Sequence, residues 1–159
     1  MPAALIEVRC DYSVVPEIAI MDAVQTALIR AFRVPETDRN VRLISHLPHR
    51  FTYAPELARP ELRTIVTIEC FAGRSTEAKR HLYREIVEGL EKVGIPADHV
   101  STILHEIELQ NWGVGGGLPA GAAEPSFSVN TSTTARPPGC GSQERRAAQG
   151  LRDRSQGPS

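Results

Sequence analysis

The residue with the most distinctive chemistry is Pro2, which directly follows Met1. Methionine aminopeptidases remove the first methionine when a small residue follows it, and we expect that removal here. The secondary amine of Pro2 would then be the N-terminus, and a free α-amino group titrates near about 8. Burial or nearby guanidinium groups lower such a pKa, which would make Pro2 a base at physiological pH. Taken alone, an exposed terminus without a role is the alternative interpretation.

A second candidate is Arg74, within the segment Phe71–Ser75. This segment joins an expected strand to an expected helix, where backbone N–H groups and an arginine can together bind a carboxylate. The pattern therefore predicts an anionic substrate. The alternative is a surface ion pair between Arg74 and an acidic residue of the helix.

A third candidate is Trp112, the single tryptophan of the chain, which precedes glycines at 113, 115, 116 and 117. Glycines at such positions allow a tight hairpin that could bring Trp112 close to a ligand. Packing of Trp112 in a subunit interface is the alternative. The run does not match phosphate-binding fingerprints, because neither Lys-Ser/Thr nor a strong helix follows it.

The elements that must position these residues form two similar units. In the first, an apolar β-branched run predicts a strand at residues 5–9, and apolar residues at helical spacing predict a helix that opens at Pro16. Pro35 ends this helix near Arg33, because proline disfavours the helical conformation of the residue before it. A second strand is expected at residues 41–45.

The second unit repeats this order about 59 residues later. Strands are predicted at residues 63–69 and 100–104, and the helix between them begins after Ser75 and ends before Gly94. We therefore expect an internal β-α-β duplication. The predicted fold class is α/β (α+β), with a four-stranded sheet and both helices on one face. The other face carries apolar residues and should be covered by another subunit.

Composition and charge restrict the partners. The chain has 159 residues, with 18 basic and 19 acidic side chains, and its net charge of -1 gives no basic field for nucleic acid or anionic membranes. No apolar run approaches the roughly 20 residues needed to span a bilayer, so a cytoplasmic protein is expected. The three cysteines are widely spaced, which argues against a disulfide framework or a metal site, and we expect Cys10 and Cys70 in the core.

The chain divides near residue 120. Residues 1–120 form the expected folded domain, while residues 121–159 are rich in Gly, Pro, Ser and Thr and poor in large apolar side chains. A segment of this composition cannot offset the entropy lost on ordering, so we predict a disordered tail. It carries five Arg against three acidic residues and is mildly basic.

Together, Pro2, the two β-α-β units, Gly73-Arg74-Ser75 and the run Asn111–Gly116 resemble the tautomerase superfamily over about residues 2–120. The similarity is to its fused, two-unit branch, which includes malonate semialdehyde decarboxylase and cis-3-chloroacrylic acid dehalogenase. 4-Oxalocrotonate tautomerase is the single-unit relative. The resemblance implies a homotrimer, a small carboxylate-bearing substrate, and neither a metal nor an organic cofactor.

The resemblance also implies roles for individual residues. Pro2 would be the catalytic acid or base, and Arg74 would bind the substrate carboxylate or polarise its carbonyl. Trp112 would line the pocket and exclude water. Asp38 matches the acid that helps to activate water in the decarboxylase branch.

Two further arginines are candidate substrate-binding residues. Arg42 matches the second arginine of the single-unit tautomerases, and Arg39 is another cation available for a developing dienolate. The decarboxylases and dehalogenases have two arginines near the second strand–helix turn, whereas Ala72-Gly73 precedes a single arginine here. We therefore expect keto–enol tautomerisation of small enol or dienol acids rather than decarboxylation or dehalogenation.

Ala3-Ala4 is expected to lie between Pro2 and the first strand and to displace Pro2 by roughly 6–7 Å. Such a shift would disturb the geometry for proton transfer. Two alternatives therefore remain. One is a cofactor-independent hydratase or decarboxylase of a 3-oxo acid, in which Pro2 acts as a cation and Asp38 directs water. The other is a non-catalytic trimeric binding protein.

Overall fold

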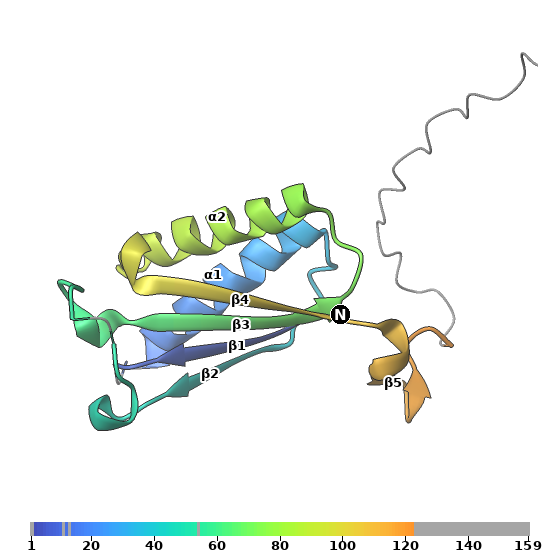
Figure 1. The fold of residues 1–159 in the computed structure, drawn as a ribbon, viewed down its shortest axis with the longest axis horizontal. Coiled ribbons are helices and arrows are strands. Elements are labelled where there is room, and N and C mark those ends of the chain that lie inside the picture. Colours follow the sequence, from blue (N-terminus) through green and yellow to red (C-terminus); the bar gives the residue numbers. More distant parts are fainter. Residues whose placement is uncertain (1, 11, 13, 54, 123–159) are drawn as a thin grey trace, which may run out of the picture.

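The computed structural model describes residues 2–10, 12, 14–53 and 55–122. Within them, one sheet and two long helices form two layers (Figure 1). The main elements are β1 (Ala3–Val8), α1 (Val14–Phe32), β2 (Val41–Ser45), β3 (Thr64–Phe71), α2 (Thr76–Lys92) and β4 (Val100–Ile107). Four single-turn 3₁₀ helices lie at Pro48–Arg50, Pro60–Leu62, Ala97–His99 and Leu109–Asn111. A small hairpin, β5 (Gly113–Val114) and β6 (Leu118–Pro119), follows β4.

The sheet confirms the predicted duplication. Its strand order is β2-β1-β3-β4. β1 pairs in parallel with β2, β3 pairs in parallel with β4, and the two units meet through the antiparallel pair β1–β3. Both helices cover the same face of this sheet (Figure 1), as the sequence predicted.

α2 shows how the sequence sets a helix and its buried face. Ser75 is the N-cap, and its hydroxyl accepts a hydrogen bond from the Ala78 N–H at 3.2 Å. The α2 side chains that face the sheet recur every fourth residue and are fully buried: Leu82, Ile86 and Leu90. Gly94 then takes a positive φ of 92°, and the Ile95 N–H bonds back to the Leu90 carbonyl, which ends the helix.

The prediction that Ala3-Ala4 separates Pro2 from the strand is wrong. Both alanines belong to β1, where Ala3 pairs with Glu69, and Ala4 pairs with Ile68 on one side and Val41 on the other. Ala3 and Ala4 are 6% and 0% exposed, and Ala4 belongs to the core under the helices. Pro2 therefore joins the strand directly.

Other predictions were shifted or corrected. β3 and β4 run further than expected, to residues 71 and 107, and α1 begins two residues before Pro16. Cys70 is buried as predicted, but Cys10 lies two residues after β1 and is half-buried, so its assignment to the core is wrong. The predicted tail lies outside the described residues except for its first two members, and Cys140 is among those not described.

The sheet face away from the helices carries exposed apolar side chains. Ile44 on β2 and Ile103 on β4 are each 45% exposed. The strand residues that pack under the helices alternate with them, since Leu43 and Leu104 contact the core. An apolar face on a β-sheet is typical of a surface that contacts another subunit.

None of the helices in the described part of the chain is both long and apolar enough to cross a membrane.

Candidate active site

The sheet topology brings most of the candidate residues to one edge. Because β1 is antiparallel to β3, the start of β1 lies beside the carboxyl end of β3. β4 is parallel to β3, and Phe71 and Ile107, the last residues of these strands, pair with each other. β2 is parallel to β1, so its first residue lies at the same edge. Figure 1 shows the N-terminus there, beside the segments that leave β3 and β4.

Pro2 is buried at this edge, immediately before β1. The segment preceding β2 runs beside it, because the Ala4 N–H donates to the Asn40 carbonyl at 2.9 Å. Burial disfavours a charged amine, so this position fits the low pKa expected of a proline base.

Asp38 lies two residues before Asn40, in a turn closed by a 2.9 Å hydrogen bond from its N–H to the Pro35 carbonyl. One of its carboxylate oxygens is buried. On the other side of the turn, the Gln25 side-chain amide on α1 donates to the Asp38 carbonyl at 3.0 Å. The structure thus places a partly buried carboxylate in the segment that passes beside Pro2.

The two other candidate arginines, Arg39 and Arg42, point away from Pro2 within this chain. Arg39 is exposed and forms an ion pair with Asp22 on the outer side of α1. Arg42 pairs in register with Leu5, three residues beyond Pro2, and is exposed. Its neighbours on β2 pack on the core, so Arg42 projects from the sheet face away from the helices.

Arg74 lies at the same edge but contacts α1. Its Nη1 donates to the carbonyl of Phe32, the last residue of α1, at 3.0 Å. Its Cζ lies 4.6 Å from the centroid of the Phe32 ring, a cation–π contact. Burial lowers the pKa of the Arg74 guanidinium, and its Nε is buried without a hydrogen-bond partner among the described residues. Further N–H groups of Arg74 therefore remain for a ligand.

The corner between β3 and α2 already holds a carboxylate. Glu106 on β4 pairs with Lys79 at 2.6 Å, and Lys79 lowers the Glu106 pKa most strongly. The backbone of Gly73 and Arg74 also lowers it through hydrogen bonds. The backbone at Gly73 and Arg74, where a substrate carboxylate was expected, thus already interacts with Glu106, and the Arg74 side chain remains a candidate for binding an anion.

Trp112 forms an aromatic wall with Phe71. Their rings meet edge to face, with centroids 5.2 Å apart and an interplanar angle of 74°. Phe71 is 5% exposed and ends β3, while Trp112 follows β4 and is half-buried. The Ala120 N–H bonds to the Trp112 carbonyl at 2.8 Å and fixes the hairpin that follows. The glycine-rich segment therefore folds as predicted and holds an aromatic pair beside the strand ends.

Sequence reasoning missed the groups that hold these residues in place: Gln25, Phe32, Phe71 and Glu106. A signal existed for Gln25, because it interrupts the apolar stripe of α1. None existed for Glu106, whose partners Lys79 and Arg74 are 27 and 32 positions away in the sequence.

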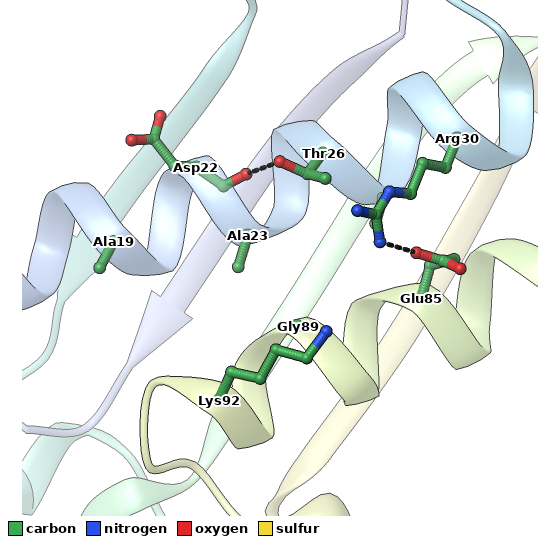
Figure 2. A pocket seen from close by; sticks show the side chains of 9 residues that line it. Ala19, Asp22, Ala23, Thr26, Arg30, Glu85, Gly89 and Lys92 are labelled. Atoms are coloured by element: carbon green, nitrogen blue, oxygen red, sulfur yellow. Dashed lines mark hydrogen bonds and ion pairs between the residues drawn. The ribbon is translucent and has the colours of Figure 1, made fainter.

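A hollow between the helices is separate from this edge. Its volume is about 260 Å³, and it lies between α1 and α2, over the small residues Ala19, Ala23 and Gly89 (Figure 2). The helices approach closely at its floor, where a Cβ at position 89 would lie 3.3 Å from the Ala23 Cβ. The ion pair between Arg30 and Glu85 crosses it. No candidate site residue lines it.

The opposite edge of the sheet holds a second polar cluster, which the chain itself closes. His99 is 1% exposed, with its Nδ1 2.7 Å from Asp98 and its Nε2 accepting the Arg59 N–H at 3.1 Å. Burial raises the pKa of Tyr12, also in this region, to about 12. No group of three or more His, Cys, Asp or Glu side chains suited to a metal ion occurs among the residues that the structure describes.

Comparison with known proteins gives one consistent result. The family model described as "Tautomerase enzyme" matches residues 38–115. A probable tautomerase of Lactiplantibacillus plantarum is 38% identical over 55 residues, which cover 34% of this chain and 86% of that protein.

Solved structures agree with this match. A malonate semialdehyde decarboxylase inhibited by 3-bromopropiolate is 28% identical, with a TM-score of 0.62 over 74% of this chain and 92% of its own. A fused 4-OT trimer is 16% identical and shares the fold, with a TM-score of 0.68 over 76% of this chain and 97% of its own. The duplicated fold, its buried proline edge and these matches agree, and the chain belongs to the tautomerase family of enzymes.

Proposed function

We propose that this chain is a cofactor-independent tautomerase that interconverts the enol and keto forms of small carboxylic acids. The observation that supports this most is the convergence of Pro2, the Asp38 turn, Arg74 and the Trp112 wall at one sheet edge. They come from four separate segments of the chain, and the strand pairings of the sheet bring those segments together.

In the proposed mechanism, removal of Met1 exposes the Pro2 amine, which is neutral and basic because it is buried. Arg74 binds the carboxylate of a 2-hydroxy-dienoate or a similar enol acid through the N–H groups that Phe32 leaves unused. Pro2 takes the proton from the enol oxygen and delivers a proton to carbon. Phe71 and Trp112 exclude water, which strengthens the interaction of Arg74 with the developing dienolate.

We further propose that the protein acts as a homotrimer. The exposed Ile44 and Ile103 lie on the sheet face that the helices leave uncovered. Arg42 projects from the same face, so in a trimer it would approach a neighbouring copy instead of its own Pro2. One of the solved proteins with this fold is itself a fused 4-OT trimer.

The test is ultraviolet-monitored ketonisation of 2-hydroxymuconate and phenylenolpyruvate by untagged protein whose N-terminus is verified by intact mass. We expect turnover that saturates with substrate and a raised KM in Arg74→Lys, because lysine lacks the planar fork of donors. Arg84→Lys is the matched control, since Arg84 is exposed on α2, the helix that begins just after Arg74. Absence of turnover with Met1 removed would contradict the proposal.

A second candidate function is hydration or decarboxylation of a 3-oxo acid. The partly buried Asp38 carboxylate favours it, together with the likeness to a malonate semialdehyde decarboxylase. In this reaction Pro2 would be a cation that polarises a carbonyl, and Asp38 would direct water. Release of CO₂ from malonate semialdehyde, lost in Asp38→Asn, would support this function over tautomerisation.

The third alternative, a non-catalytic binding protein, depended on displacement of Pro2 by Ala3-Ala4. Both alanines form part of β1, so that reason no longer applies.

A further inference from the structure

Gln25 is a buried amide on an otherwise apolar face of α1. It is 4% exposed, while its neighbours on that face, Val24 and Leu28, are core residues at 0% and 1%. A buried polar side chain costs free energy unless its groups are hydrogen-bonded. Packing alone therefore does not explain why a glutamine occupies this position.

Its hydrogen bonds are incomplete. The Nε2 donates to the Asp38 carbonyl at 3.0 Å, but Oε1 is buried and has no partner among the described residues. An unsatisfied buried acceptor is destabilising, and a leucine of similar volume would avoid that cost. The hydrogen bond that Gln25 makes among the described residues joins α1 to the turn that carries Asp38.

This turn leads directly to the proline edge. The Asp38 N–H bonds to the Pro35 carbonyl at 2.9 Å, and two residues later the Asn40 carbonyl accepts the Ala4 N–H at 2.9 Å. The strand pairing holds this segment at Asn40, and the Gln25 bond from α1 holds it at Asp38. Loss of the Gln25 bond would remove this link between α1 and the Asp38 turn and let the turn shift relative to Pro2.

We propose that Gln25 is a positioning residue, which holds the Asp38 turn at the distance from Pro2 that catalysis requires. The proposal rests on the proposed function, whether the reaction at Pro2 is tautomerisation or hydration. Gln25 touches neither Pro2 nor the substrate and acts through the Asp38 backbone.

The experiment compares Gln25→Leu with the wild type and with Thr26→Ala. Thr26 is the next residue on α1 and lines the hollow between the helices, and its hydroxyl donates to the Asp22 carbonyl of the same helix (Figure 2). Its loss therefore controls for a general effect on the helix. We expect Gln25→Leu to lower kcat about 10-fold or more, with a much smaller change in KM, because misplacement of a reacting group affects chemistry before binding. Thr26→Ala should leave both constants unchanged.

Hydrogen exchange of the Asp38 amide reports whether the Gln25–Asp38 hydrogen bond holds the turn, and it needs no substrate. This amide should exchange about 10-fold faster in Gln25→Leu than in the wild type, while its exchange in Thr26→Ala stays the same. Gln25→Glu adds a rescue test: the protonated acid can donate to the Asp38 carbonyl, and the carboxylate cannot. Its kcat should therefore fall as pH rises through the titration of Glu at this position, a limb absent from the wild type.

Wild-type kcat and wild-type Asp38 exchange in Gln25→Leu would overturn the proposal. So would faster exchange with unchanged kcat in that variant, or a wild-type pH profile in Gln25→Glu. Failure of the proposed function has a different signature, since the wild type itself would then lack turnover. In that case, unchanged Asp38 exchange in Gln25→Leu would still show that the Gln25 bond does not hold the Asp38 turn.

Discussion

Replacement of Arg74 by methionine separates the structural role of this residue from its proposed role in binding substrate. Methionine keeps an unbranched stem that can rest on the Phe32 ring, and it removes the guanidinium. Two favourable contacts disappear with it: the 3.0 Å hydrogen bond to the Phe32 carbonyl and the cation–π contact at 4.6 Å.

The expected change in the free energy of unfolding is small. A hydrogen bond from a charged donor contributes about 1.5–3 kcal/mol, and an exposed cation–π contact contributes about 0.5–1 kcal/mol. Against these losses, the substitution removes a buried Nε without a partner, whose burial costs about 1–3 kcal/mol. Arg74 is only half-buried, so solvent weakens every one of these effects. We expect Arg74→Met to be destabilised by about 1 kcal/mol.

The assay is urea unfolding followed by circular dichroism, with turnover of an enol acid measured on the same preparation. Arg84→Met is the matched control, because Arg84 is exposed and its pair with Glu77 is 3.9 Å long. We expect Arg74→Met to lose most of kcat/KM while it remains folded, and Arg84→Met to behave like the wild type. A loss of more than about 3 kcal/mol in Arg74→Met would refute the reasoning and make Arg74 primarily a clasp between the two units.

Two further predictions concern the stability of the fold. Tyr12→Phe should make the free energy of unfolding less dependent on pH between 10 and 12. Burial raises the pKa of Tyr12 to about 12, so the wild type loses about 1–2 kcal/mol of unfolding free energy over this range, and the variant does not. Urea midpoints measured across this pH range would show it, and parallel profiles would contradict it. Ser75→Ala should lose about 1 kcal/mol of unfolding free energy, because it removes the cap on the Ala78 N–H. Ser75→Gly should lose only a few tenths, and equal losses in both variants would argue against a capping role.

The fold was predictable because its signals are local. The stripe of Leu82, Ile86 and Leu90 repeats every four residues, and Ser75 and Gly94 mark the two ends of α2 in the sequence itself. The duplication was visible as a repeated order of elements, and the parallel pairing within each unit followed from it.

The start of β1 was not predictable in the same way. Alanine has little preference for strands, so Ala3-Ala4 gave no local sign of one. Its strand conformation comes from pairing on both sides, with Glu69 and Ile68 in β3 and with Val41 in β2. Such pairings join residues far apart in the sequence.

The sequence was enough to predict which residues lie at the site, but not which partners they contact. Pro2, Arg74 and Trp112 occur at motif positions, and the sheet brings their segments to one edge. The partners that orient side chains were not visible, because Glu106 at the β3–α2 corner and Asp22 beside Arg39 depend on tertiary packing.

The most direct test of the central claim is the turnover of 2-hydroxymuconate by Pro2→Ala, compared with the wild type at verified loss of Met1. Alanine also permits removal of Met1 and leaves a free amine, so the variant changes the proline ring and its secondary amine alone. General acid–base catalysis by a positioned group contributes about 10²–10⁴ in rate, so we predict that kcat falls at least about 100-fold in a variant that stays folded. Turnover of Pro2→Ala at the wild-type rate would show that the reaction does not depend on Pro2 and would contradict the account.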